Sequence, residues 1–97
     1  MYVTGISSKS IIEKLPYEKI DVEYREFPDG EMYIRFEEKI KKIREILIVQ
    51  SLYSPQNTHL MQLFFMLDAC GELNINVHLF VPYLAYARQD KRFKDYE

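Results

Sequence analysis

Apolar and polar residues alternate over two stretches in the first half of the chain. Over residues 20–27, isoleucine, valine and tyrosine alternate with acidic and basic residues, and residues 32–36 alternate in the same way. A period of two is typical of strands that bury one face. Between these stretches, residues 28–31 read Pro-Asp-Gly-Glu, a strong turn signal because glycine readily adopts positive φ. The pattern therefore predicts a β-hairpin.

Other stretches are apolar without alternation. Residues 46–49 read Ile-Leu-Ile-Val, and residues 77–81 form a second, mostly apolar run. Runs of this kind are typical of strands that are covered on both faces, as in parallel sheets. Residues 2–6 are shorter and partly apolar, and we read them as a first strand that ends near Gly5.

Two segments between these strands carry helix signals. Serines precede the apolar residues of the segment 11–15, and a serine hydroxyl in that place accepts from free backbone amides at the start of a helix. The same glycine-serine loop offers amides to an anion as an alternative, although a full phosphate-loop pattern is absent. Residues 60–73 predict the strongest helix, with Asn57 or Thr58 as its expected cap.

The helix over residues 60–73 is apolar nearly all round. Such a helix must be buried on more than one side. One side can lie on a sheet, and we expect another subunit or a missing part of the same domain to cover the other.

The order strand, helix, strand predicts a βαβ unit, and hence an α/β fold with a mostly parallel sheet. Parallel strands place their carboxyl ends at one edge of the sheet, where ligands of open α/β folds bind. The loops after Gln50 and Pro82 should therefore lie side by side, joined by residues 5–8 if the first strand is also parallel. This arrangement places Arg88 and Gln89 in a cleft.

Charged residues concentrate in two places. Residues 38–45, EKIKKIRE, alternate in charge, as solvated surfaces usually do. Residues 88–94 place four cations, one amide and one acid directly after a predicted strand. Arginine offers a rigid fork and lysine a mobile charge for phosphate oxygens, so this segment suits a polyanionic ligand. On composition alone, an ordinary solvated loop is the favoured interpretation, because charged loops are common.

Length and composition limit the possible classes of protein. A chain of 97 residues forms at most one small domain, and 47% hydrophobic residues indicate a globular one. A net charge of -2 gives no reason to expect nucleic acid or a membrane as a partner, and no apolar run is long enough to span a bilayer. The only cysteine, Cys70, excludes a disulfide framework, so we predict a reducing compartment, the cytoplasm.

Residues that support metal or covalent chemistry are scarce. His59 and His78 have no partner at metal-ligand spacing, so we interpret both as structural and predict no metal ligands. No serine or cysteine stands with a partnered histidine as a nucleophile. Phosphate and nucleotide binding remain.

Three segments, in order, carry a family resemblance. They are FPDGEMYIR at residues 27–35, the stretch 50–63 with its SPQN and LMQL, and PYLAYARQDKRFK at residues 82–94. Together they resemble ribose-phosphate pyrophosphokinases, the enzymes that make phosphoribosyl pyrophosphate, over most of the chain from about Gly5 to Phe93. The resemblance implies a type I phosphoribosyltransferase-like fold. Residues 1–97 would form the N-terminal, ATP-binding part of that domain, with the remainder of the enzyme outside this chain.

The resemblance also implies how ATP is held at the hairpin. Members of the family hold the adenine with this turn, often across a subunit boundary. Phe27 would pack on the base, Asp29 and Glu31 would accept from its exocyclic amine, and Gly30 belongs to the same loop. A homo-oligomer with an ATP site shared between subunits is therefore implied.

The third segment would provide the catalytic side. By resemblance, Arg88 contacts the phosphates of ATP, Gln89 contacts ATP, and Lys91 and Arg92 open a mobile catalytic loop. The family transfers diphosphate from ATP, with Mg²⁺, to the anomeric hydroxyl of ribose 5-phosphate. The family's downstream metal-binding histidine and ribose 5-phosphate loop are absent, so these 97 residues alone should be inactive.

Two rivals stay open. One is a catalytically silent homologue that assembles with the enzyme as a regulatory or structural subunit. The other is a nucleic-acid-binding module that uses residues 39–44 and 88–94, which the near-neutral net charge disfavours.

Overall fold

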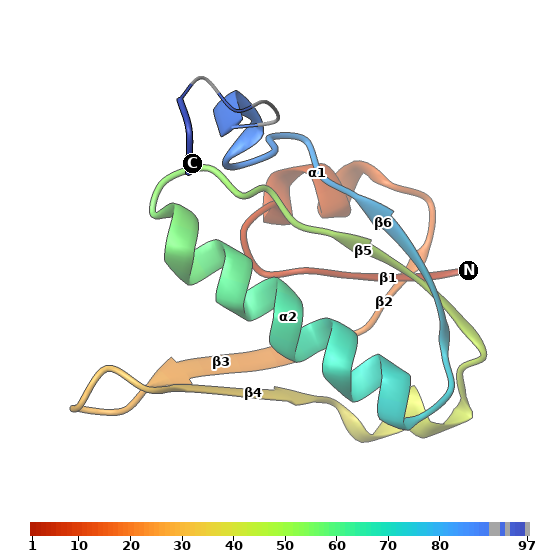
Figure 1. Ribbon diagram of the computed structural model, residues 1–97. Coiled ribbons are helices and arrows are strands. Elements are labelled where there is room, and N and C mark those ends of the chain that lie inside the picture. The colour runs from red at the N-terminus through yellow and green to blue at the C-terminus, as the bar shows by residue number, and fades with distance from the viewer. Residues whose placement is uncertain (90–91, 93, 97) are drawn as a thin grey trace.

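The computed structural model describes residues 1–89, 92 and 94–96, with one parallel sheet and a separate hairpin (Figure 1). The sheet has the strand order β2-β1-β5-β6, and all neighbouring strands are parallel. The strands are β1 (Tyr2–Thr4), β2 (Glu18–Lys19), β5 (Glu45–Val49) and β6 (Asn76–Phe80). The predicted α/β fold with a mostly parallel sheet is confirmed.

The interior strand β5 is covered on both faces, as its continuous apolar sequence predicts. Ile46 and Ile48 are fully buried in the cluster that contains the buried face of α2 (Gln56–Glu72). Val49 is equally buried on the opposite face, in the cluster that contains α1 (Lys9–Lys14). Side chains of a strand point alternately to its two faces, so the same run of residues fills both layers of the core.

The hairpin forms a second layer over α2. Strands β3 (Val22–Glu26) and β4 (Met32–Phe36) pair antiparallel, which confirms the predicted hairpin. Helix α2 lies between this hairpin and the parallel sheet (Figure 1), and Leu63 and Met66 are buried in the cluster that includes β4 and the sheet. The second cover for this apolar helix therefore comes partly from the same chain, where we had expected it from outside.

A stripe of α2 remains uncovered within this chain. Met61, Phe64 and Phe65 are 41%, 51% and 42% exposed, although they are among the largest apolar side chains of the helix. Their spacing of three and four residues places them on one helical face.

The helix start predicted at the serines is confirmed, but the capping predicted for both helices needs correction. Ser8 is the N-cap residue of α1, but its hydroxyl accepts from the amide of Ser51 at 3.0 Å rather than from the helix. Helix α2 begins four residues earlier than predicted, with Pro55 as the N-cap residue, so the expected cap by Asn57 or Thr58 is wrong. At α1 a contact between two loops thus replaces the local capping bond.

The burial predicted for the last strand is wrong. Leu79 and Phe80 of β6 are 46% and 49% exposed, because β6 is the edge strand of the sheet and only β5 pairs with it. An apolar run alone does not tell whether a strand lies inside a sheet or at its edge.

Two smaller differences concern the charged link and the first edge strand. Residues Glu38–Lys42 form a 3₁₀ helix whose Ile40, together with Ile43, enters the core, so the link is not purely a solvated surface. The two-residue strand β2 was not predicted, and the hairpin begins at Val22 instead of Ile20.

Candidate functional site

At the carboxyl edge of the parallel sheet, the side chain of Gln50 connects the loop after β1 with the first turns of α2. Its Oε1 accepts from the amides of Ile6 and Ser7, both at 3.0 Å. Its Nε2 donates to the carbonyl of His59 at 3.2 Å and to Oε1 of Gln62 at 3.0 Å. The Gln50 side chain is fully buried, and its bond to Gln62 is buried with it, whereas its three bonds to the backbone are partly buried. The loop after β1, the end of β5 and the first turns of α2 are thereby fixed relative to one another.

This network decides between the two interpretations of the glycine-serine loop. The amides of Ile6 and Ser7 already bind Gln50, and the Ser7 hydroxyl donates to the Ser51 carbonyl at 2.7 Å. These groups therefore serve the loop-to-loop packing and are not directed toward an anion.

The loop after β6 lies beside the loop after β5, as predicted. The amide of Leu52 donates to the carbonyl of Tyr83 at 2.9 Å, and the rings of Tyr53 and Tyr83 meet edge to face with centroids 5.2 Å apart. These contacts hold the loop after β6 against the loop after β5 at Tyr83.

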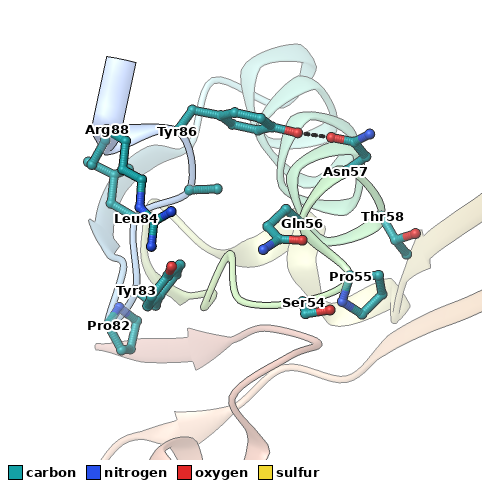
Figure 2. A pocket seen from close by; sticks show the side chains of 12 residues that line it. Ser54, Pro55, Gln56, Asn57, Thr58, Pro82, Tyr83, Leu84, Tyr86 and Arg88 are labelled. Atoms are coloured by element: carbon teal, nitrogen blue, oxygen red, sulfur yellow. Dashed lines mark hydrogen bonds between the residues drawn. The ribbon is translucent and has the colours of Figure 1, made fainter. Parts of the chain in front are cut away.

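A cleft of about 950 Å³ opens between this loop and the start of α2. Figure 2 shows Pro82–Arg88 along one wall and Ser54–Thr58 along the other. The prediction that Arg88 lies in a cleft at this edge is confirmed. Arg88 belongs to the short 3₁₀ helix Ala87–Gln89, which also contains the backbone of Gln89.

The cleft is electropositive at two points. On one wall, Arg88 carries a guanidinium and lines the cleft. On the other wall, the first turn of α2 carries the unbonded amides and the positive end of the helix dipole. An anion between the two walls would meet both, which is the chemistry that phosphate recognition requires.

Tyr86 connects the two walls. Its hydroxyl donates to Oδ1 of Asn57 in the first turn of α2, as Figure 2 shows. Its backbone has φ of 66°, in the left-handed region that residues other than glycine seldom adopt. Such a conformation persists where surrounding contacts over-determine it, and it occurs here two residues before Arg88. Sequence reasoning missed Tyr86, Asn57 and Gln50 as organisers of this site.

The other predicted catalytic residues are placed less completely. Arg92 is exposed and does not line the cleft, and Lys91 lies outside the described residues. The predicted roles of Arg88, Gln89, Lys91 and Arg92 remain predictions.

The predicted adenine-binding residues gather at the tip of the hairpin. The amide of Gly30 donates to the carbonyl of Phe27 and the amide of Phe27 donates to the carbonyl of Glu31, at 2.9 and 2.8 Å, which closes a tight turn. Gly30 has φ of 93°, a conformation that explains glycine at this position. The Asp29 carboxylate accepts from the Glu31 amide through Oδ1 at 3.0 Å, which holds it against the turn, and the Phe27 side chain is exposed.

The hairpin tip and the cleft are not brought together in one chain. In Figure 1 the tip lies at the lower left, whereas the loop that contains Arg88 lies at the top, with α2 between them. Phe27 and Arg88 therefore belong to two separate surfaces.

Other titratable groups add no further centre. In the ranges 1–89, 92 and 94–96, no three His, Cys, Asp or Glu side chains gather as a metal site. Burial raises the pKa of the Cys70 thiol. His59 Nδ1 lies 2.6 Å from the Tyr53 carbonyl, and His78 Nε2 lies 2.5 Å from Oε1 of Glu45. None of the helices that the structure describes combines the length and hydropathy needed to cross a bilayer.

Comparisons with known proteins agree with these features. The chain is 43% identical to the ribose-phosphate pyrophosphokinase of Sulfolobus acidocaldarius over 93% of this chain and 30% of that protein. It is 48% identical to the enzyme of Sulfurisphaera tokodaii over 80% of this chain and 27% of that protein. It thus spans less than a third of the length of these relatives.

A solved structure shows the same fold. The phosphoribosylpyrophosphate synthetase of Mycobacterium smegmatis superimposes with a TM-score of 0.84 and 27% identity, over 100% of this chain and 34% of that one. Residues 6–97 match the family described as the N-terminal domain of ribose phosphate pyrophosphokinase. The chain therefore belongs to the ribose phosphate pyrophosphokinase family, whose N-terminal domain it matches.

Proposed function

We propose that this chain is the ATP-binding, N-terminal part of a ribose-phosphate diphosphokinase. The observation that carries the proposal is the cleft in which Arg88 lines one wall and the N-terminal turn of α2 lines the other. The names of the family and of its relatives support a ribose phosphate substrate and the transfer of a pyrophosphate group, and we propose ATP and ribose 5-phosphate as the substrates.

The proposed reaction needs positioning and charge neutralisation more than covalent chemistry. The anomeric hydroxyl of ribose 5-phosphate gives up its proton to solvent as its oxygen forms a bond to the β-phosphorus of ATP. The bond between the β-phosphorus and the oxygen that leads to the α-phosphorus breaks, and AMP leaves with that oxygen. Negative charge develops on the phosphoryl oxygens, so a guanidinium such as that of Arg88 stabilises the transition state. Lys91 and Arg92 are proposed to add cations as their loop closes.

We further propose that the complete ATP site forms between two copies of the chain. The base-binding hairpin tip and the phosphate-binding cleft lie on separate surfaces of one chain (Figure 1). A hairpin from a neighbouring copy would bring Phe27, Asp29 and Glu31 to the adenine, while Arg88 and Gln89 contact the rest of ATP. A homo-oligomer is therefore the arrangement that would bring the base-binding hairpin and the phosphate-binding cleft to the same ATP molecule.

Mg²⁺ enters this proposal only as the counter-ion of ATP. The described residues hold no group of three His, Cys, Asp or Glu side chains that fits a bound metal, so no step is assigned to a metal here. The location in the cytoplasm also remains a proposal, based on the single buried Cys70.

The test is release of AMP from Mg-ATP, with and without ribose 5-phosphate, by the full-length protein of verified intact mass. Ribose-dependent AMP is the expected result. No AMP from the full-length protein would contradict the proposal and favour a catalytically silent relative that assembles with the enzyme.

A further inference from the structure

The outer face of the hairpin carries a stack of one cation and two aromatic rings. In the antiparallel register Arg25 of β3 stands directly opposite Tyr33 of β4. Phe27 follows two residues after Arg25, and a period of two places it on the same face. The opposite face carries Val22, Ile34 and Phe36, which belong to or pack against the core. Arg25 is thus displayed away from the core, next to the turn.

Distances define the stack. The guanidinium carbon of Arg25 lies over the Tyr33 ring, 4.6 Å from its centroid, and over the Phe27 ring, 5.5 Å from its centroid. Both distances fall within the range of cation–π attraction, about 6 Å. The two rings also meet edge to face, with centroids 6.3 Å apart at 74°. Three side chains therefore hold one another in place.

The stack contrasts with the other arginine on this face. Arg35 stands opposite Glu23 in the register, and no cation–π contact of Arg35 is recorded among the described residues. The carboxylate of Glu23 reaches only to 4.0 Å of Arg25, with both side chains more than half exposed. Such an exposed pair contributes little, so the aromatic contacts account for the position of Arg25.

The stack constrains how a planar ligand can approach Phe27. Arg25 covers one face of the ring, yet Phe27 remains 42% exposed. A base that stacks on Phe27 must therefore use the face that Arg25 leaves open. A ring whose rotamer is already held loses less conformational freedom when the base binds.

We propose that Arg25 is a positioning residue for the nucleotide base, which orients the Phe27 ring by stacking between it and Tyr33. This inference rests on the proposed function, because it presumes that adenine packs on Phe27. In this proposal Arg25 affects ATP binding by orienting Phe27, and not by attracting the charged phosphates.

The test uses the full-length protein with the variants R25A, R25K, F27A and the double variant R25A/F27A. R35A is the matched control, since it removes a second arginine from the same face without touching the stack. The KM for ATP, the KM for ribose 5-phosphate and kcat are measured by AMP release. Calorimetry with α,β-methylene-ATP, whose scissile bridge cannot break, gives affinity without turnover. Inhibition by inorganic tripolyphosphate, which has no base, reports the phosphate contacts alone.

In R25A we expect about a three- to ten-fold rise in the KM for ATP and in the dissociation constant of α,β-methylene-ATP. This factor corresponds to the conformational entropy that one side chain loses when a ligand orders it. The kcat, the KM for ribose 5-phosphate and tripolyphosphate inhibition should stay within about two-fold. R25K keeps the charge but not the planar group, so it should fall between wild type and R25A. In the F27A background, R25A should have no further effect, because the ring that Arg25 orients is gone.

Several results would overturn the proposal. The proposal is wrong if R25A has the same kinetics and affinity as R35A. It is also wrong if R25A weakens inhibition by tripolyphosphate, or if the effects of R25A and F27A on ATP affinity add fully. Failure of α,β-methylene-ATP to bind the wild-type protein would overturn it as well. If α,β-methylene-ATP binds but no ribose-dependent AMP forms, the proposed reaction is wrong. The dissociation constants of α,β-methylene-ATP for R25A and R35A then decide the role of Arg25 separately.

Discussion

Replacing Gln50 with leucine should destabilise the chain far more than the same change at an exposed glutamine. Gln50 accepts two backbone hydrogen bonds and donates two more while fully buried. Leucine has a similar volume, so the perturbation is the loss of those four bonds and not a cavity. The amides of Ile6 and Ser7 are only partly buried, so water can restore some of their hydrogen bonding.

The magnitude follows from what remains unpaired. The Gln62 side chain is 3% exposed, and without Gln50 its Oε1 loses the donor that it has now. Leaving one buried polar group unpaired costs about 1–3 kcal/mol, and each remaining bond contributes about 1 kcal/mol when water replaces it incompletely. We therefore expect Q50L to lower the free energy of unfolding by about 3 kcal/mol.

Urea unfolding followed by far-ultraviolet circular dichroism measures this change, with Q56L as the control. Gln56 is exposed, and we expect Q56L to stay within about 0.5 kcal/mol of wild type. The double variant Q50L/Q62L removes both partners of the buried pair and should be less destabilised than the two single changes added together. A Q50L variant as stable as Q56L would refute the assignment of Gln50 as the link between the loop after β1, the end of β5 and the first turns of α2.

Two further predictions concern the close packing around Gly5 and the position of the loop after β6. A Cβ on Gly5 would lie 1.9 Å from the Val49 carbonyl oxygen, so Gly5→Ala should lower the free energy of unfolding by about 3 kcal/mol. A Cβ on Gly71 meets open space within a helix, so Gly71→Ala should raise it by about 0.5–1 kcal/mol. Urea unfolding measures both changes. Equal effects of the two alanines would contradict this. Tyr86→Phe removes the hydrogen bond to Asn57, so it should raise the KM for ATP a few-fold while the circular dichroism stays unchanged. An unchanged KM would show that this bond does not position the loop.

Much of the fold could be predicted because its signals are local. The continuous run in β5 predicted a strand covered on both faces, and the turn at residues 28–31 predicted the hairpin. Period, turn chemistry and apolar runs act within a few residues, so one sequence reveals them. The placement of Arg88 in a cleft also followed, because parallel strands end at the same edge of a sheet.

What could not be predicted depends on contacts between distant segments. Gln50 bonds to residues that are more than 40 positions away, and a single glutamine after a strand gives no sign of such partners. The exposure of Leu79 and Phe80 depends on the strand order, which a run of apolar residues does not contain. The stack of Arg25 on Tyr33 and Phe27 requires the exact cross-strand register.

The most direct test of the central claim is the turnover of Arg88→Ala in the full-length protein. The readout is ribose 5-phosphate-dependent AMP release, and R44A is a control at an exposed arginine that does not line the cleft. If Arg88 stabilises charge on the phosphates, R88A should lose about a hundred-fold or more in kcat/KM while its circular dichroism matches wild type. An R88A protein with wild-type turnover would contradict the assignment of this cleft as the phosphate-binding half of the site.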